Sequence, residues 1–171
     1  MSKLLWRTHF LGGAAAGLLL ASQHTDLRTA AISAGIAGVA ALLPDLDDPH
    51  SKLGRVVAPA SWAVQVTVGH RGPLHSVLGA MVITLLAVIV LRFWYAPVYV
   101  YNHLALLILS GYFSHLVMDT LNPQGVPWLW PLKIRFRMPL IRTGGLLEHF
   151  AVTPAMLFLC SWLVWSLIKM S

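Results

Sequence analysis

The sequence predicts an all-α integral membrane protein, a helical bundle of about five spans, and three observations support this fold class. The first is composition: of 171 residues, 57% are hydrophobic and 11% are charged, too few polar side chains to cover a water-soluble globule of this size. The second is a series of long apolar segments separated by polar ones. The third is the lack of strand-type alternation, because only helices or closed barrels satisfy backbone groups in lipid. We therefore expect one membrane-embedded domain over residues 1–171.

The five expected spans differ in length and composition. The first two are short and rich in glycine and alanine, so we expect them to pack closely against neighbouring helices and to tilt or to reach only part way across. Lys3 and Arg7 precede the first, but the residues after it form a poor cleavage site, so we expect a retained helix instead of a signal peptide. The expected spans are Phe10–Gln23, Thr29–Pro44, Ser76–Leu91, Pro97–Met118 and Phe150–Ile168.

Two long connections hold most of the polar residues, and within the first of them Val56–Val68 is amphipathic enough to lie along the membrane surface. If all five segments cross, the N-terminus and both connections share one side of the membrane. The positive-inside rule makes that side the cytoplasmic face of a bacterial-type inner membrane. The cations on it are Lys3, Arg7, Lys52, Arg55, Arg71, Lys133, Arg135, Arg137 and Arg142, against Arg28, Arg92 and Lys169 on the other.

The scarce ionisable residues lie at the expected helix ends on the cytoplasmic side. Ionisable residues at a membrane edge are costly to keep, and a bundle can bring helix ends together, so imidazoles that converge with carboxylates indicate a metal site. The residues are His9 at the start of the first segment, Asp45 after the second, His70 and His75 before the third, His115 and Asp119 in the fourth, and Glu148 before the fifth.

His115 and Asp119 form the strongest local signal. A spacing of four places both side chains on one helix face, where they can grip one ion or bridge two. The alternative is a capping aspartate beside a histidine that bonds a backbone carbonyl. The sequence leaves both interpretations open.

Two further segments suggest similar chemistry. The turn from Gly69 to Ser76 presents two imidazoles that can bind metal and Arg71, which can stabilise charge on an attacked phosphoryl group; the alternative is a basic juxtamembrane turn. Asp45, Asp47 and Asp48 follow the end of the second segment, where carboxylates oppose the helix dipole and need a cation; the alternative is a surface turn. Likewise, an interfacial histidine would explain His9, and a first-turn charge would explain Glu148.

Other features indicate a membrane interface. Trp128 and Trp130 predict an aromatic belt, and the strip Lys133–Arg137 either meets lipid phosphates or serves topology alone. The basic residues form no groove with interleaved stacking aromatics, so we expect no nucleic-acid partner. No Gly-rich phosphate loop, serine nucleophile elbow or His-Glu-x-x-His motif is present.

Several of these motifs occur in an order that resembles the YdjM-like family of membrane-bound, metal-dependent hydrolases. They are His9, Leu43–Pro49, Gly69–Gly72 with His75-Ser76, Gly111-Tyr112 with Ser114-His115 and Asp119, and Gly125–Pro127 with Leu129–Pro131. That family is distantly similar to zinc-dependent phospholipase C and P1 nuclease, all-helical enzymes that cleave phosphate esters with three zinc ions. The resemblance implies metal ligands at His9, Asp45, His70 or His75, His115 and Asp119. The later His-x-x-x-Glu pair and the N-terminal Trp ligand have no counterpart, so we expect one or two ions.

Together these observations predict a membrane-bound metal hydrolase for a phosphate ester on a lipid or membrane-associated substrate. The ion is expected to be divalent, most simply zinc, and to generate hydroxide near neutral pH. Asp47 or Glu148 would act as base or outer ligand, and Arg71 would bind phosphoryl oxygens. A membrane protein that binds metal without catalysis, as a permease or a structural partner, is the alternative. Polar residues at one face, not at the bilayer midplane, argue against a permease.

Overall fold

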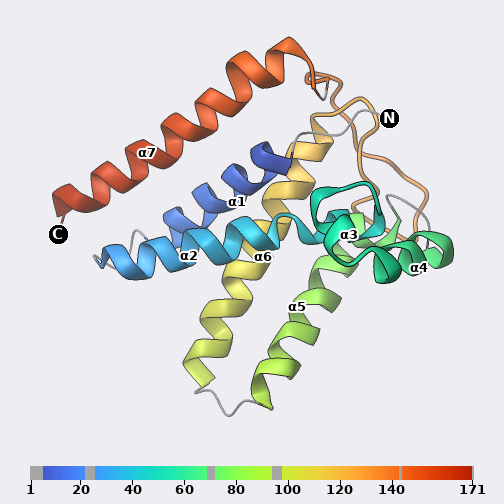
Figure 1. The fold of residues 1–171 in the computed structure, drawn as a ribbon, viewed down its shortest axis with the longest axis horizontal. Helices are drawn as coiled ribbons and strands as arrows, with labels where there is room; N and C mark the ends of the chain where they lie inside the picture. The colour runs from blue at the N-terminus through green and yellow to red at the C-terminus, as the bar shows by residue number, and fades with distance from the viewer. Residues whose placement is uncertain (1–5, 22–25, 69–71, 94–97, 143, 171) are drawn as a thin grey trace.

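The computed structural model describes residues 6–21, 26–68, 72–93, 98–142 and 144–170, and their regular structure is helical (Figure 1). Within these ranges the strand-like pairing is limited to one isolated antiparallel bridge between Val126 and Phe136. The predicted all-α fold class is confirmed. The helices are α1 (Trp6–Ala21), α2 (Leu27–Ala40), α3 (Lys52–Val56), α4 (Ala58–Val68), α5 (Val77–Arg92), α6 (Val98–Thr120) and α7 (Thr153–Met170), with the short segments η1 (Leu43–Asp47), η2 (Pro73–His75) and η3 (Glu148–Val152).

Local sequence explains both ends of α2. The side chain of Asp26 caps its N-terminus, accepting hydrogen bonds from the backbone N–H groups of Arg28 at 3.1 Å and Thr29 at 3.0 Å. The helix ends at Ala40, earlier than predicted, and η1 then begins with Pro44 in its first turn. A proline is well tolerated there, because the backbone N–H that it lacks would have no hydrogen-bond partner within the helix. The predicted segment Thr29–Pro44 is therefore α2 followed by the start of η1, which carries Asp45 and Asp47.

Three helices meet at the backbone of Ala37 on α2. Gly13 of α1 and Gly111 of α6 both lie against the carbonyl oxygen of this residue, and a methyl group on either glycine would overlap with that oxygen. Figure 1 shows α6 crossing α1 and α2. Small residues let helix backbones approach closely in this way. The close packing predicted for the glycine-rich first segments thus sets the spacing of the helices that carry the site.

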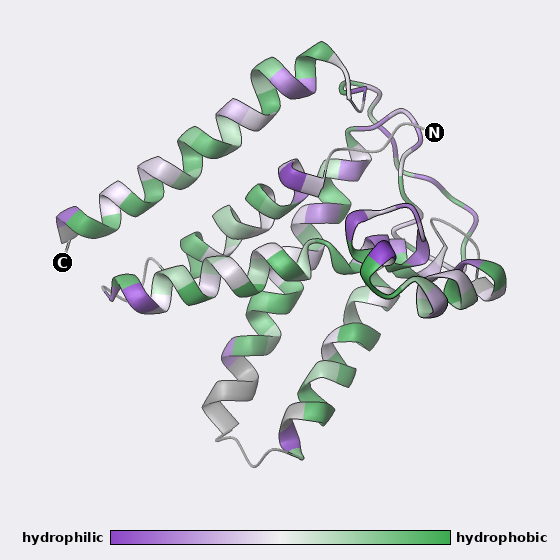
Figure 2. Cartoon of the chain, in the orientation of Figure 1, coloured by the Kyte–Doolittle hydropathy of each residue, from purple (hydrophilic) through white to green (hydrophobic). Residues whose placement is uncertain are grey.

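The outer helices expose apolar side chains. Phe158 of α7 is 73% exposed and Leu85 of α5 is 59% exposed, and both helices are largely green in the hydropathy view of Figure 2. Among the described residues, Leu27–Asp47 and Glu148–Lys169 are long and apolar enough to cross a membrane, and Val77–Val90 is a shorter apolar helix. Such faces suit lipid better than water. The prediction of five crossings stays a prediction.

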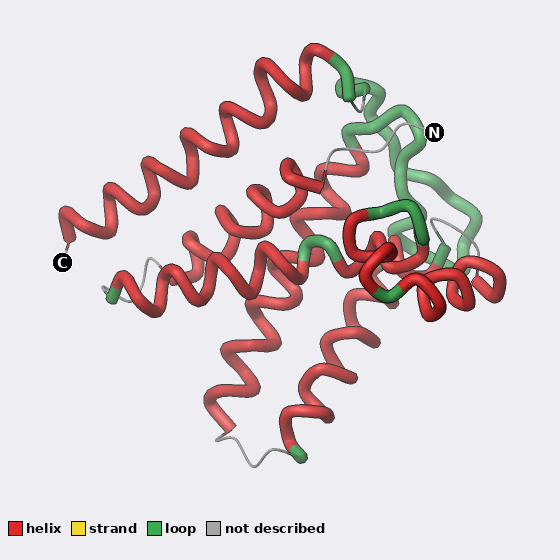
Figure 3. The backbone as a smooth tube through the Cα atoms, viewed as in Figure 1, coloured by secondary structure: helices red, strands yellow, loops and turns green. Residues whose placement is uncertain are grey.

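The two long connections fold back over the helix ends. The first contains η1, α3, α4 and η2, so that the amphipathic stretch predicted at Val56–Val68 is largely the helix α4. The second is mostly irregular, and Figure 3 shows it as a long loop running along one side of the bundle. It is tied to the end of α6 by hydrogen bonds from the Met138 N–H to the Thr120 carbonyl, at 2.7 Å, and from the Ile141 N–H to the Leu121 carbonyl, at 3.0 Å.

Candidate metal centre

Five of the predicted ligands lie together in the interior, brought there by four different turns or helix ends. His9 lies in the first turn of α1, Asp45 on η1, and His75 at the end of η2; His115 and Asp119 lie on the last turns of α6. All five are buried, with Asp45 the most exposed at 7%. Convergence of buried imidazoles and carboxylates is the arrangement that a metal ion stabilises.

His115 bonds a backbone carbonyl through one ring nitrogen and leaves the other available for a metal, so both interpretations of its sequence context apply. Its Nδ1 lies 2.7 Å from the carbonyl oxygen of Ala41, so Nδ1 carries the proton and donates it. The opposite nitrogen, Nε2, then has a lone pair, lies 3.7 Å from Oδ2 of Asp119, and has no hydrogen-bond partner among the described residues. A backbone carbonyl that fixes the tautomer of a histidine in this way is typical of metal sites.

His75 is oriented by a carboxylate. Its Nδ1 lies 3.1 Å from Oδ2 of Asp47, which is fully buried. Its Nε2 lies 3.9 Å from both Oδ1 of Asp45 and Oδ2 of Asp119. A carboxylate–histidine pair of this kind holds the ring and raises its basicity toward a metal. Asp47, predicted as base or outer ligand, occupies the outer-ligand position behind His75.

His9 completes the cluster from the side of α1. Its ring stacks on that of His115 with the centroids 3.9 Å apart, and its Nε2 lies 3.4 Å from Oδ1 of Asp119. Its Nδ1 has no hydrogen-bond partner among the residues that the structure describes. The stacking places both rings at the same ligand group, where a neutral imidazole nitrogen can bind metal.

The separations fit metal ligands better than hydrogen bonds. One ligand atom from each of His9, His115 and Asp119 lies within 4.8 Å of the others, and the same holds for Asp45, His75 and His115. Ligand atoms bound to one tetrahedral zinc at 2.0–2.1 Å are roughly 3.3 Å apart. The nitrogen–oxygen distances between the histidines and Asp119 run from 3.4 Å to 3.9 Å, close to that value. The donor set therefore fits one divalent ion, or two bridged by Asp119.

Glu148 is buried but stands outside both groups of ligands. Its Oε1 accepts a hydrogen bond from the Thr8 hydroxyl at 2.9 Å, and its Oε2 accepts one from the Gly144 N–H at 2.7 Å. It therefore links the start of η3 to the turn of α1 that carries His9. Thr8, fully buried, was missed by sequence analysis because one threonine in a helix start carries no distinct signal.

The remaining predictions separate into two kinds. Asp48 accepts a hydrogen bond from the backbone N–H of His50 at 2.9 Å, which is the surface-turn alternative for this residue. His70 and Arg71 lie outside the described residues. The structure therefore places Asp48 away from the ligand groups and leaves the predicted roles of the other two as predictions.

Fold and site together define an all-helical protein with exposed apolar helices and a buried histidine–aspartate centre at its helix ends. The sequence matches the YdjM inner membrane protein family over residues 4–171. The chain belongs to this family and is a membrane protein, which confirms the family predicted from the motifs; the hydrolase activity that the resemblance implied stays a prediction.

Its relatives agree with this membership. The inner membrane protein YdjM of Escherichia coli (strain K12) is 39% identical over 129 residues, covering 72% of this chain and 61% of the relative, so the chain spans less than two thirds of that protein. YvsG of Bacillus subtilis (strain 168) is 28% identical over 156 residues, covering 90% and 91%. The inner membrane protein YbcI of Escherichia coli (strain K12) is 35% identical over 95 residues, covering 54% and 50%. No solved structure matches.

Proposed function

We propose that this protein is a membrane-bound, metal-dependent hydrolase that cleaves a phosphate ester on a lipid or membrane-associated substrate. The observation that carries the proposal is the orientation of two buried histidines. His75 and His115 are each held through Nδ1, so that both Nε2 atoms face the same carboxylate, Asp119. A buried histidine needs a hydrogen-bond partner whether or not it binds metal. Here, however, the Nδ1 atoms are fixed so that both Nε2 atoms face one carboxylate, and this arrangement suits metal binding.

Each residue has a role in this proposal. A divalent ion, zinc by the mixture of imidazole and carboxylate donors, would supply Lewis acidity and a nucleophile from water near neutral pH. Asp119 orients toward His9 through one oxygen and toward His115 through the other, so it can hold one ion or bridge two. Asp47 keeps the proton of His75 on Nδ1. Glu148 would act as base only by giving up a hydrogen bond such as those it accepts from Thr8 and Gly144.

A phosphate ester is the preferred substrate because of charge. The chain carries twelve Lys and Arg residues against six Asp and Glu residues, and nine of the cations belong to the predicted cytoplasmic side, where the ligand-bearing helix ends are also predicted to lie. Guanidinium groups bind the oxygens of phosphate in pairs, and Arg71 is predicted to serve this purpose. Acyl and peptide substrates would not need so many cations.

Burial favours a second candidate function, a membrane protein that binds metal without catalysis. None of the five converging ligand residues is more than 7% exposed, and structural metal sites are closed whereas catalytic ones keep an open position. In this reading the ion would hold α1, α6 and the two turns together. The two candidates differ in whether water and substrate reach the ion.

Metal analysis of purified protein, paired with ester hydrolysis assays, tests both. We expect stoichiometric zinc or a similar ion, and turnover of a phosphate monoester, a diester or a phospholipid that stops on chelation. Arg71→Lys should keep the metal but lower turnover by about 10- to 1000-fold, because the planar two-pronged contact is lost. Activity that survives chelation would refute the hydrolase mechanism. Stoichiometric metal without turnover on a broad ester panel would favour the non-catalytic candidate.

The orientation of the centre is a separate proposal. Nine of twelve cations belong to the N-terminus and the two long connections, so we place these parts and the metal centre in the cytoplasm. A C-terminal alkaline phosphatase fusion should then be active, because five crossings would put that end outside. An inactive phosphatase fusion together with an active cytoplasmic reporter at the same position would contradict the five-span arrangement.

A further inference from the structure

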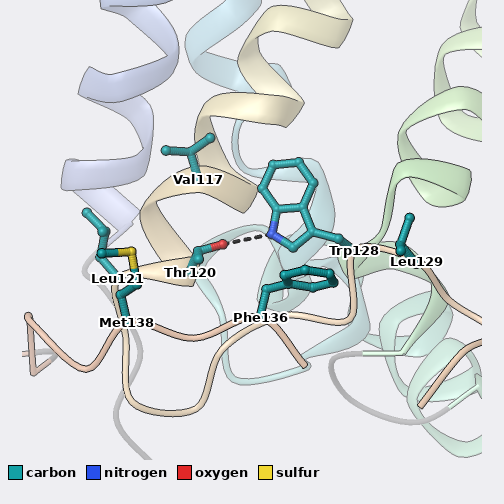
Figure 4. A pocket seen from close by; sticks show the side chains of 7 residues that line it. All are labelled: Val117, Thr120, Leu121, Trp128, Leu129, Phe136 and Met138. Atoms are coloured by element: carbon teal, nitrogen blue, oxygen red, sulfur yellow. Dashed lines mark hydrogen bonds between the residues drawn. The ribbon is translucent and has the colours of Figure 1, made fainter. Parts of the chain in front are cut away.

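An apolar pocket lies beside the metal centre, on the other side of the last turns of α6. It has a volume of about 440 Å³, within the range of binding sites for small ligands. Figure 4 shows its side chains, which come from the end of α6 and from the second long connection. The lining residues are Val117, Thr120, Leu121, Trp128, Leu129, Phe136 and Met138.

The pocket lies between the end of α6 and a part of the second connection that is held by backbone hydrogen bonds. Val117 and Thr120 lie on one side of the last turn of α6 and Leu121 follows directly after it, whereas Asp119 faces the other side and belongs to the metal centre. The opposite wall is fastened by paired hydrogen bonds between the backbones of Val126 and Phe136, both 3.0 Å long. The pocket and the buried carboxylate therefore lie on different sides of the same helix end.

The polar groups of the lining side chains already have partners. The hydroxyl of Thr120 donates to the carbonyl of Leu116 at 2.8 Å and accepts from the indole N–H of Trp128 at 2.8 Å; the dashed line in Figure 4 marks the second bond. What remains facing the pocket is aliphatic carbon, aromatic rings and the Met138 thioether. A polar ligand would lose its hydrogen bonds to water there without replacement. The pocket therefore suits a hydrocarbon chain.

Cations flank the pocket along residues 133–137, which are exposed throughout. Phe136 lines the pocket, and its neighbours Arg135 and Arg137 are exposed, so two cations stand next to one wall of the pocket. Neither arginine forms an ion pair with any described acidic residue. The segment thus joins an apolar wall of the pocket to two uncompensated cations, a combination typical of amphipathic elements at a membrane surface.

We propose that this pocket and the adjacent cationic segment bind an anionic phospholipid, with an acyl chain in the pocket and the headgroup phosphate on Arg135 and Arg137. The positive charge of the segment favours an anionic headgroup, and the apolar lining of the pocket favours a hydrocarbon chain. This site needs no turnover and is independent of the proposed hydrolase activity.

Quenching of tryptophan fluorescence by acyl-brominated lipid tests the proposal, because Trp128 lines the pocket. Full-length protein would be reconstituted in phosphatidylcholine bilayers that contain either brominated phosphatidylglycerol or brominated phosphatidylcholine. The Trp128 contribution is the difference between the parent and Trp128→Phe. We expect brominated phosphatidylglycerol to quench this contribution preferentially, and native mass spectrometry of the parent to show retained phosphatidylglycerol.

Two variants separate the chain from the headgroup. R135Q/R137Q should lose the preference for phosphatidylglycerol, by up to roughly fivefold per cation, whereas K52Q/R55Q removes the same charge elsewhere and should keep it. Val117→Phe should reduce quenching and lipid retention by filling the pocket, whereas Val39→Phe, at a valine of the same 52% exposure on α2, should change neither. Equal quenching by both lipids in the parent, or unchanged lipid retention in both R135Q/R137Q and Val117→Phe, would overturn the proposal.

Discussion

Two opposite faces of α6 end in different kinds of site. On one face, His115 and Asp119 are at most 2% exposed and depend on individual atoms, such as the carbonyl of Ala41 that holds the histidine ring. On the other face, Val117 is 52% exposed and lines a pocket whose polar groups are already satisfied. The metal centre is thus specified by hydrogen-bond direction, and the pocket by shape and net charge. Substitutions should therefore act sharply on the first and gradually on the second.

The largest effect is expected from the ligands themselves. His115→Ala or Asp119→Ala should lower metal affinity by more than about 100-fold, because an emptied coordination position costs more than loss of an outer partner. Metal content would be measured after dialysis against a zinc buffer. His50→Ala, at an exposed histidine, is the control and should keep the metal. Full metal occupancy in both ligand variants would show that the cluster is a hydrogen-bonded core.

A smaller effect on the metal centre is expected from Asp47→Asn, on η1. The amide is the same size but uncharged, so His75 loses the partner that raises its basicity, and metal affinity should fall by about 10- to 100-fold. Zinc competition with a chromophoric chelator measures this change. The lipid preference of the pocket should be unaffected. An unchanged zinc affinity would mean that Asp47 serves packing only.

The helix junction at Ala37 offers a test that sets geometry apart from ligand chemistry. Gly111→Ala puts a methyl group against the Ala37 carbonyl, which should cost about 1–3 kcal/mol of stability through forced separation of α2 and α6. Gly35→Ala is the matched control, since nothing lies within 4 Å of its added methyl. Thermal unfolding in detergent compares the two. Equal melting temperatures would show that the junction can expand freely.

The smallest effect is expected on the stability of α2 in acid and should change neither the metal centre nor the pocket. Hydrogen bonds from the Thr29 side chain and backbone lower the pKa of Asp26, the N-cap of α2, below its ordinary 3.8. A lowered folded-state pKa stabilises the fold above the unfolded value, and this contribution is lost as the pH falls through the folded-state value. Lowering the pH from neutrality to below about 3 should therefore reduce the melting temperature less in Asp26→Ala than in the parent. Identical acid dependence in both proteins would count against the cap.

The sequence allowed the residues of the candidate site to be predicted, but not the hydrogen bonds among them. The pair His115 and Asp119 could be predicted because a spacing of four along one helix fixes which face two side chains share. The hydrogen bond between Asp47 and His75 joins residues 28 apart, and that between His115 and Ala41 joins residues 74 apart. No local spacing predicts such contacts, because they depend on where separate helices cross.

The sequence by itself determined the all-α class, the membrane setting and the collection of imidazoles and carboxylates at helix ends, since composition and local periodicity reflect the solvent and the helix repeat. The tertiary structure alone decided that Asp47 stands behind His75, that Glu148 holds Thr8 and that an apolar pocket lies on the other side of α6 from Asp119. The physical reason is that glycines at the Ala37 junction set the helix spacing, and the spacing selects which nitrogen or oxygen of each side chain faces its neighbour.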